Sequence, residues 1–134
     1  MTKKISMFAI ICITFIFTCL LCSCTSSPGT YRQISQEEAA SLMKTESDYI
    51  ILDVRTPAEF AQDHIPNAIN IAVADITDVP PAELSDKDQL IMVYCRSGNR
   101  SKVAAQRLAD MGYSNVVEFG GINTWNGPVT SDET

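Results

Sequence analysis

The chain has 134 residues with 16 acidic and 10 basic side chains, a formal net charge of −6 and a single histidine. This acidic balance argues against nucleic acid as a partner, because neutralising phosphates requires a basic face. Once the N-terminal segment described next is set aside, the remaining length suits one domain with one hydrophobic core.

The first two dozen residues do not have the composition of a folded domain. Lys3 and Lys4 precede residues 5–22, an apolar run that contains no charge. A short basic start followed by an apolar run is typical of a secretory signal peptide, although this run is slightly longer than usual. Its length is close to that of a bilayer-spanning helix, so an uncleaved N-terminal transmembrane anchor is the alternative.

The four residues L-C-S-C, 21–24, resemble the lipobox of bacterial lipoproteins. The resemblance implies that residues 1–23 form a lipoprotein signal peptide, that Cys24 carries the lipid, and that residues 24–33 are the lipidated cysteine and its tether. It also places the protein in the bacterial cell envelope, lipid-anchored on the extracytoplasmic side, with the membrane as a partner through that lipid. All sixteen acidic residues follow Cys24, which gives this part of the chain a net charge of −8.

Capping signals and apolar runs predict short helices and strands along the rest of the chain. Ser35 and Glu38 form a capping box that opens a helix ending near residue 44, and Thr56 with Pro57 opens a second, shorter helix. Unbroken apolar runs predict buried strands, and apolar residues at helical spacing predict a last helix. The expected strands cover residues 49–54, 68–71, 90–94 and 115–119, the last helix covers 101–111 with Ser101 as its N-cap, residues 72–88 are irregular, and residues 128–134 form a flexible tail.

Strands that alternate with helices predict an α/β fold with a parallel sheet. In such sheets, ligands bind just beyond the carboxyl ends of the strands. Cys95 directly follows the strand at 90–94, and Asp53 and Arg55 close the strand at 49–54 on the same side. For Asp53 and Arg55, an ion pair that supports this edge of the sheet is favoured over contact with a substrate.

The stretch C-R-S-G-N-R-S, 95–101, carries the strongest chemical signal. With the lipid on Cys24, Cys95 is the only free thiol expected in the exported domain, and it is either a reactive nucleophile or a small buried side chain. Free amides at the start of the next helix, together with Arg96 and Arg100, favour the thiolate and should lower the pKa of Cys95. Gly98 allows a positive φ, so successive amides can converge on one anion.

Four blocks in this chain resemble single-domain rhodaneses, the thiosulfate:thiol or cyanide sulfurtransferases. They are L-D-V-R-T-P-A-E-F with H-I-P-N-A-I-N-I, V-Y-C-R-S-G-N-R-S, G-Y-S-N-V, and G-G-I-N-T-W. The resemblance implies a rhodanese-like domain over residues 34–127, with a small parallel sheet of about five strands and helices on both faces. It implies that Cys95 forms a persulfide, taking sulfane sulfur from a donor such as thiosulfate and passing it to a thiol or cyanide acceptor. No cofactor is implied, and the partners are that small-molecule donor and a thiol acceptor that comes from elsewhere.

The same resemblance assigns the substrate-binding residues. The backbone amides from Arg96 to Arg100 hold the transferred sulfur, and the side chains of Arg96 and Arg100 meet the charge of the donor. The hydroxyl of Ser101 adds a further contact. The substrate-binding set is Arg96, Ser97, Gly98, Asn99, Arg100 and Ser101, and no metal site is expected.

Two other functions stay open. A non-catalytic module could use the same loop to bind or sense sulfide or another anion. A cysteine phosphatase or arsenate reductase is disfavoured, because phosphatases place an arginine six positions after the nucleophile, whereas position 101 is serine and Arg100 comes one residue too early. The chain also departs from rhodaneses at Asp63, which replaces the usual glycine before H-I-P, and His64 is interpreted as a structural residue.

Overall fold

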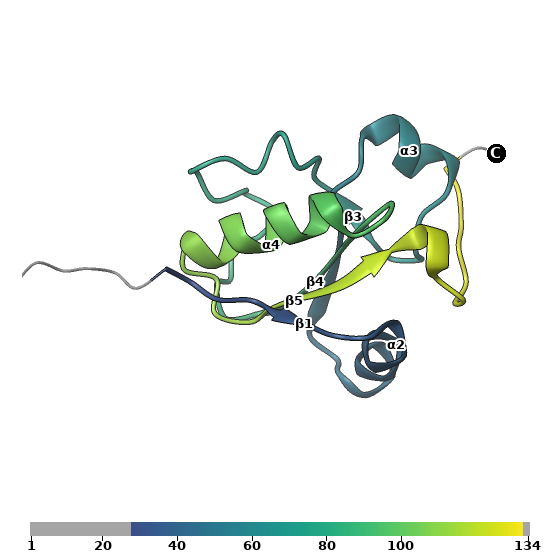
Figure 1. Cartoon of the computed structure of the whole chain (residues 1–134), viewed down its shortest axis with the longest axis horizontal. Helices are drawn as coiled ribbons and strands as arrows, with labels where there is room; N and C mark the ends of the chain where they lie inside the picture. The colour runs from purple at the N-terminus through teal and green to yellow at the C-terminus, as the bar shows by residue number, and fades with distance from the viewer. Residues whose placement is uncertain (1–27, 133–134) are drawn as a thin grey trace, which may run out of the picture.

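The computed structural model describes residues 28–132. They form a five-stranded parallel sheet in the order β1-β5-β4-β2-β3, with α2 on one face and α4 on the other (Figure 1). This confirms the predicted α/β fold with helices on both faces of the sheet. The elements are β1 Arg32–Gln33, α2 Gln36–Thr45, β2 Tyr49–Asp53, α3 Pro57–Gln62, β3 Ile69–Asn70, β4 Leu90–Cys95, α4 Asn99–Asp110, β5 Val116–Gly121 and a short 3-10 helix, η2, Ile122–Thr124.

Helices α2 and α3 begin where their capping residues predict. The Ser35 hydroxyl accepts a hydrogen bond from the backbone N–H of Glu38 at 3.1 Å. In α3, Thr56 and Glu59 form a complete capping box, and Pro57 is the first helical residue. Each cap satisfies backbone N–H groups that the first helical turn leaves without a partner.

The start of α4 differs from the prediction. The helix begins at Asn99, and its N-cap is Gly98, whose φ of 99° lies in the left-handed region. Ser101 therefore lies within the first turn, where it is completely buried. The prediction that Ser101 is the N-cap is wrong, because its hydroxyl is held by groups from distant parts of the chain that local sequence does not reveal.

Both faces of the sheet are buried, as the unbroken apolar runs predict. Ile91, Val93 and Cys95 of β4 pack in the half of the core that includes α4, whereas Met92 and Tyr94 pack in the half that includes α2. This alternation follows from the two-residue period of a strand. Every residue of β4 is buried, so the strand that carries Cys95 is a rigid central support.

The N-terminal segment of the described chain packs on the domain instead of forming a free tether. The side chain of Gln106 donates to the carbonyl of Gly29 at 2.8 Å, and β1 pairs with β5. Residues 28–33, the described part of the predicted tether at 24–33, therefore belong to the folded domain. The predicted signal peptide and the lipidated Cys24 lie outside the described residues. Within residues 28–132, no helix is long and apolar enough to cross a bilayer.

The C-terminal segment is also held. Thr130 exchanges two backbone hydrogen bonds with His64, each 2.8 Å long, and the N–H of Asp132 donates to the carbonyl of Ala61 at 3.1 Å. This corrects the predicted flexible tail as far as residue 132. The sequence could not show it, because the partners lie more than sixty residues away along the chain.

Candidate active site

The site lies at the carboxyl edge of the sheet, where β4 ends at Cys95 and residues 96–98 lead into α4. Cys95 is in register with Gly121 of β5, after an irregularity in the strand pairing. An ideal Cβ on Gly121 would lie only 2.2 Å from the carbonyl oxygen of Arg96. The loop therefore packs directly on the backbone of β5, and Gly121 is the residue that permits this contact.

The thiol of Cys95 lies beneath this loop and is 1 % exposed. The backbone N–H of Gly98 donates to its Sγ at 3.0 Å, and the hydroxyl oxygen of Ser101 lies 3.4 Å from Sγ. Burial raises the pKa of Cys95, but hydrogen bonds from Ser101 and from the backbone N–H groups of Gly98 and Ser97 outweigh it, so the pKa is lowered. The sequence left two alternatives for Cys95, a reactive nucleophile or a small buried side chain. The side chain is buried, and its lowered pKa favours the thiolate.

The other loop residues fall into two groups. Gly98 and Ser101 are buried beside the sulfur, whereas Arg96, Ser97 and Asn99 are exposed. The positive φ expected of Gly98 is observed, at 99°. The predicted residues are therefore brought together, with the buried pair next to the thiol and the exposed ones on the outer side of the loop.

A buried carboxylate behind the loop was missed in the sequence. Glu118 of β5 is 3 % exposed, and its Oε1 accepts hydrogen bonds from the Ser101 hydroxyl at 2.6 Å and from the Gly120 N–H at 2.9 Å. The available signal was the position of one acidic residue within the apolar run of a buried strand. Such a residue needs a polar partner inside the fold, because a lone buried carboxylate is costly.

Arg100 forms an ion pair that the sequence did not reveal. Its guanidinium forms two hydrogen bonds with the Glu59 carboxylate, at 2.7 and 2.8 Å. The bonds with Arg100 are the largest cause that lowers the pKa of Glu59, to about 2. Since Glu59 also caps α3 at Thr56, one carboxylate connects the starts of two helices, α3 and α4.

Arg96 is the loop cation that stays available. Its side chain forms no ion pair with any residue between 28 and 132. It lines a cavity of about 270 Å³ next to the loop. The cavity is lined by Arg55, Glu59, Gln62, Asp63, Arg96, Ile122 and Asn123. This hollow gives an anion a polar approach to the loop from the side of Arg96.

The end of β2 carries the ion pair that the sequence predicted. Arg55 and Asp53 are both buried, and the guanidinium contacts the Asp53 carboxylate at 2.8 Å. A second bond, 2.9 Å long, joins Arg55 to the carboxylate of Asp63. Asp63 has a φ of −158°, an extended conformation that any residue adopts, so the loss of glycine here costs no backbone strain.

His64 has the contacts of a structural residue. Its ring stacks on Phe60 with centroids 3.9 Å apart, and Nδ1 lies 2.8 Å from the Phe60 carbonyl oxygen. Its backbone pairs with Thr130, as described above. These contacts occupy the imidazole without involving Cys95.

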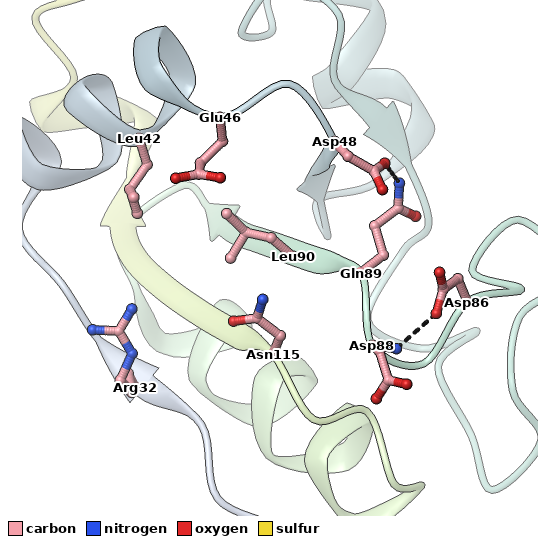
Figure 2. Close-up of a pocket in the computed structure, with 9 residues that line it drawn as sticks. All are labelled: Arg32, Leu42, Glu46, Asp48, Asp86, Asp88, Gln89, Leu90 and Asn115. Carbon is pink, nitrogen blue, oxygen red and sulfur yellow. Dashed lines mark hydrogen bonds between the residues drawn. The ribbon is translucent and has the colours of Figure 1, made fainter.

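A cavity larger than the one beside Arg96 lies at the opposite edge of the sheet. It has a volume of about 380 Å³ and contains Leu90 at the start of β4 and Asn115 just before β5 (Figure 2). Four acidic side chains line it, Glu46, Asp48, Asp86 and Asp88, with Arg32 the one cation. Within residues 28–132, no three His, Cys, Asp or Glu side chains are grouped so that they could hold a metal. The size of a cavity therefore does not identify the functional site here. The thiol and the loop that surrounds it lie at the other edge of the sheet, with Cys95.

Comparisons with known proteins agree with this geometry. Residues 35–127 match the family model of the rhodanese-like domain. The thiosulfate sulfurtransferase GlpE of Coxiella burnetii is 36% identical over 96 residues, which cover 71% of this chain and 87% of that protein. The adenylyltransferase and sulfurtransferase UBA4 of Candida albicans is 36% identical over 106 residues, which cover 74% of this chain but 24% of that protein.

A solved structure shows the same fold. A rhodanese with anions from E. coli superimposes with a TM-score of 0.57 and 32% identity, covering 62% of this chain and 98% of that one. The matched family region spans both the strand that ends in Cys95 and the strand that carries Glu118. The chain therefore belongs to the family of rhodanese-like domains.

Proposed function

We propose that the protein is a sulfurtransferase that moves sulfane sulfur from a donor such as thiosulfate to a thiol or cyanide acceptor through a persulfide on Cys95. Membership of the rhodanese-like family supports sulfur transfer in general, and GlpE is a thiosulfate sulfurtransferase by name. The observation that carries the proposal is the position of Sγ, at the end of a buried strand and 3.0 Å from the N–H of Gly98.

The reaction has two displacements at sulfur. In the first, the Cys95 thiolate attacks the sulfane sulfur of thiosulfate, and the new S–S bond forms as sulfite leaves with the electron pair of the old one. The outer sulfur of the persulfide then carries the negative charge, and the backbone N–H groups of the loop stabilise it. In the second, an acceptor thiolate or cyanide attacks that outer sulfur, and Cys95 leaves as a thiolate.

A turnover assay with thiosulfate and cyanide tests this proposal. The expected result is release of sulfite and thiocyanate, with an intermediate whose intact mass is greater by one sulfur on Cys95. Retention of thiosulfate without turnover would instead identify an anion-binding module. Hydrolysis of an aryl phosphate without sulfur transfer would identify a phosphatase.

Replacing Arg96 by alanine should weaken donor capture. The guanidinium is exposed beside the loop and has no ion pair within residues 28–132, so its charge is available to the thiosulfate dianion. We expect the KM for thiosulfate to rise about tenfold with a small change in kcat, the loss of one exposed charge-assisted contact. Lys102→Ala is the matched control, because it removes the same charge from an exposed side chain on α4. Equal KM changes in both variants would mean that only overall charge matters.

We further propose that the chain is exported and held in the bacterial cell envelope by a lipid on Cys24. The support is the charge-free run at 5–22 followed by L-C-S-C. Sulfur donors and the acceptor thiol would then meet the domain outside the cytoplasm. Intact mass of the protein extracted from bacterial membranes tests this: loss of residues 1–23 with a lipid on Cys24 agrees with it, whereas retention of these residues identifies a transmembrane anchor.

A further inference from the structure

Three polar groups from three elements form a chain of contacts beneath the loop. They are Cys95 at the end of β4, Ser101 in the first turn of α4, and Glu118 of β5. The Ser101 hydroxyl oxygen is 3.4 Å from Sγ on one side and 2.6 Å from Oε1 of Glu118 on the other. All three side chains are at least 97 % buried. The hydroxyl thus contacts both a thiol and a carboxyl that are shielded from water.

A hydroxyl has one proton to donate. The carbonyl oxygen of Gly98, 3.0 Å from Oγ of Ser101, is a third acceptor beside Glu118 and Cys95. Two arrangements let Ser101 bridge the thiol and the carboxyl. If Glu118 is ionised, Ser101 donates to it, and its oxygen accepts the S–H of Cys95. If Cys95 is ionised, Ser101 donates to Sγ, and its oxygen accepts a hydrogen bond from the O–H of a neutral Glu118. Ionising both would place two negative charges around one buried hydroxyl, which is strongly unfavourable.

The surroundings of Glu118 favour this coupling. No Lys, Arg or His side chain between residues 28 and 132 forms an ion pair with it. Its partner in register on β1 is Gln33, which has no charge. On the α4 side, the residues after Ser101 that pack in this half of the core are uncharged: Ala104, Ala105 and Leu108.

The charged groups near Cys95 lie at the mouth of the loop. They are Arg100, which is already bound to Glu59 of α3, and the exposed Arg96. Neither forms an ion pair with Glu118, whose Oε1 accepts from the Ser101 hydroxyl and the Gly120 N–H.

We propose that Glu118 is a positioning residue that takes up the proton of Cys95 through the hydroxyl of Ser101. In this step the proton on Sγ moves to Oγ of Ser101 while the hydroxyl's own proton moves to Oε1 of Glu118. One S–H bond and one O–H bond break, two O–H bonds form, and the net charge of the three groups is unchanged. The reverse movement returns the proton when the thiolate is regenerated. Its role in sulfur transfer rests on the function proposed above, whereas the proton transfer itself does not.

Titration of the Cys95 thiolate by its ultraviolet absorbance tests the coupling. Each full-length protein is measured as a difference from its own Cys95→Ser counterpart, which cancels the other four cysteines and the tyrosines. Glu118→Gln keeps the shape, can donate to Ser101 and cannot take up a proton. We expect the wild type to form its thiolate in two steps, the second at a raised pH because Glu118 is then also ionised. The variant should form it in one step, with a midpoint lower than that second step by about one pH unit or more. The control Glu83→Gln removes an exposed acidic residue and should leave the midpoint unchanged.

The route through Ser101 has its own test. In a Ser101→Ala background, Glu118→Gln should change the midpoint much less than in the wild type. An undiminished change would mean that the two charges interact only through space and would overturn the relay. An unchanged midpoint on Glu118→Gln in the wild type would overturn the coupling altogether.

An infrared measurement needs no variant of Glu118. At a pH where Cys95 is a thiolate, the wild type should show the C=O band of a protonated carboxyl, and Cys95→Ser should lack it. Absence of this band from the wild type would contradict the proposal. None of these measurements uses thiosulfate, so a failure of sulfur transfer and a failure of the proton coupling are seen separately.

Discussion

Cys95→Ser should abolish sulfur transfer, with a loss of at least about 10³-fold in turnover. A serine hydroxyl has nearly the same shape but does not ionise in this pH range, and it cannot carry a persulfide. The hydrogen bond from Gly98 to position 95 can still form, so the fold should stay intact. Sulfite release from thiosulfate measures the loss.

The full-length Cys95→Ser variant also tests whether another cysteine carries the sulfur. It keeps Cys12, Cys19, Cys22 and Cys24. A gain of one sulfur in the intact mass of Cys95→Ser would show that another cysteine is the carrier, and residual turnover close to the wild type would rule out Cys95 as the nucleophile.

Gly121→Ala should damage both stability and transfer. The new methyl carbon would lie 2.2 Å from the Arg96 carbonyl oxygen and 2.6 Å from Cα of Ser97, so the loop must move away from β5. Overpacking of this kind lowers the free energy of unfolding by about 1–3 kcal/mol. A shift of about 1 Å in the amides around the sulfur costs roughly 10²-fold in rate. Urea unfolding and sulfite release measure the two effects.

Gly112→Ala is the matched control, at the end of α4 away from the loop. Gly112 has a φ of +92°, so alanine is strained there, but the nearest atom to its Cβ is Nζ of Lys87 at 3.8 Å. We expect a loss of about 1 kcal/mol in the free energy of unfolding and normal sulfur transfer. If both variants lost equal stability and kept full activity, the contact of the loop with β5 would have no functional role.

The sequence was informative wherever the signal is local. The apolar runs predicted β2 and β4, and the pairs Ser35–Glu38 and Thr56–Glu59 predicted the starts of α2 and α3. The glycine in the loop predicted its positive φ. These features depend on side chains within a few residues of one another, so their chemistry is visible without the fold.

The features that the sequence did not reveal depend on partners far along the chain. β1 has only two residues, both exposed, and it exists because it pairs with β5. The ion-pair partner of Arg100, Glu59, lies 41 residues away along the chain. Ser101 lies next to a helix start, so local sequence predicts a cap, whereas its partner Glu118 belongs to a later strand. In each case the sequence shows a polar or charged side chain, but tertiary packing decides which group that residue contacts.

The attachment of the N-terminal segment to α4 determines which end of this helix would lie nearer to a lipid on Cys24. Gly29 packs against the backbone of Ala109, near the last residue of α4, whereas the Cys95 loop leads into its first residue, Asn99 (Figure 1). The helix has 12 residues, so its two ends are about 18 Å apart. Because only residues 25–28 separate Gly29 from Cys24, a lipid there would keep the far end of the helix close to the headgroups. The reactive sulfur would then open toward the aqueous phase, where water-soluble donors and acceptors reach it without entering the bilayer.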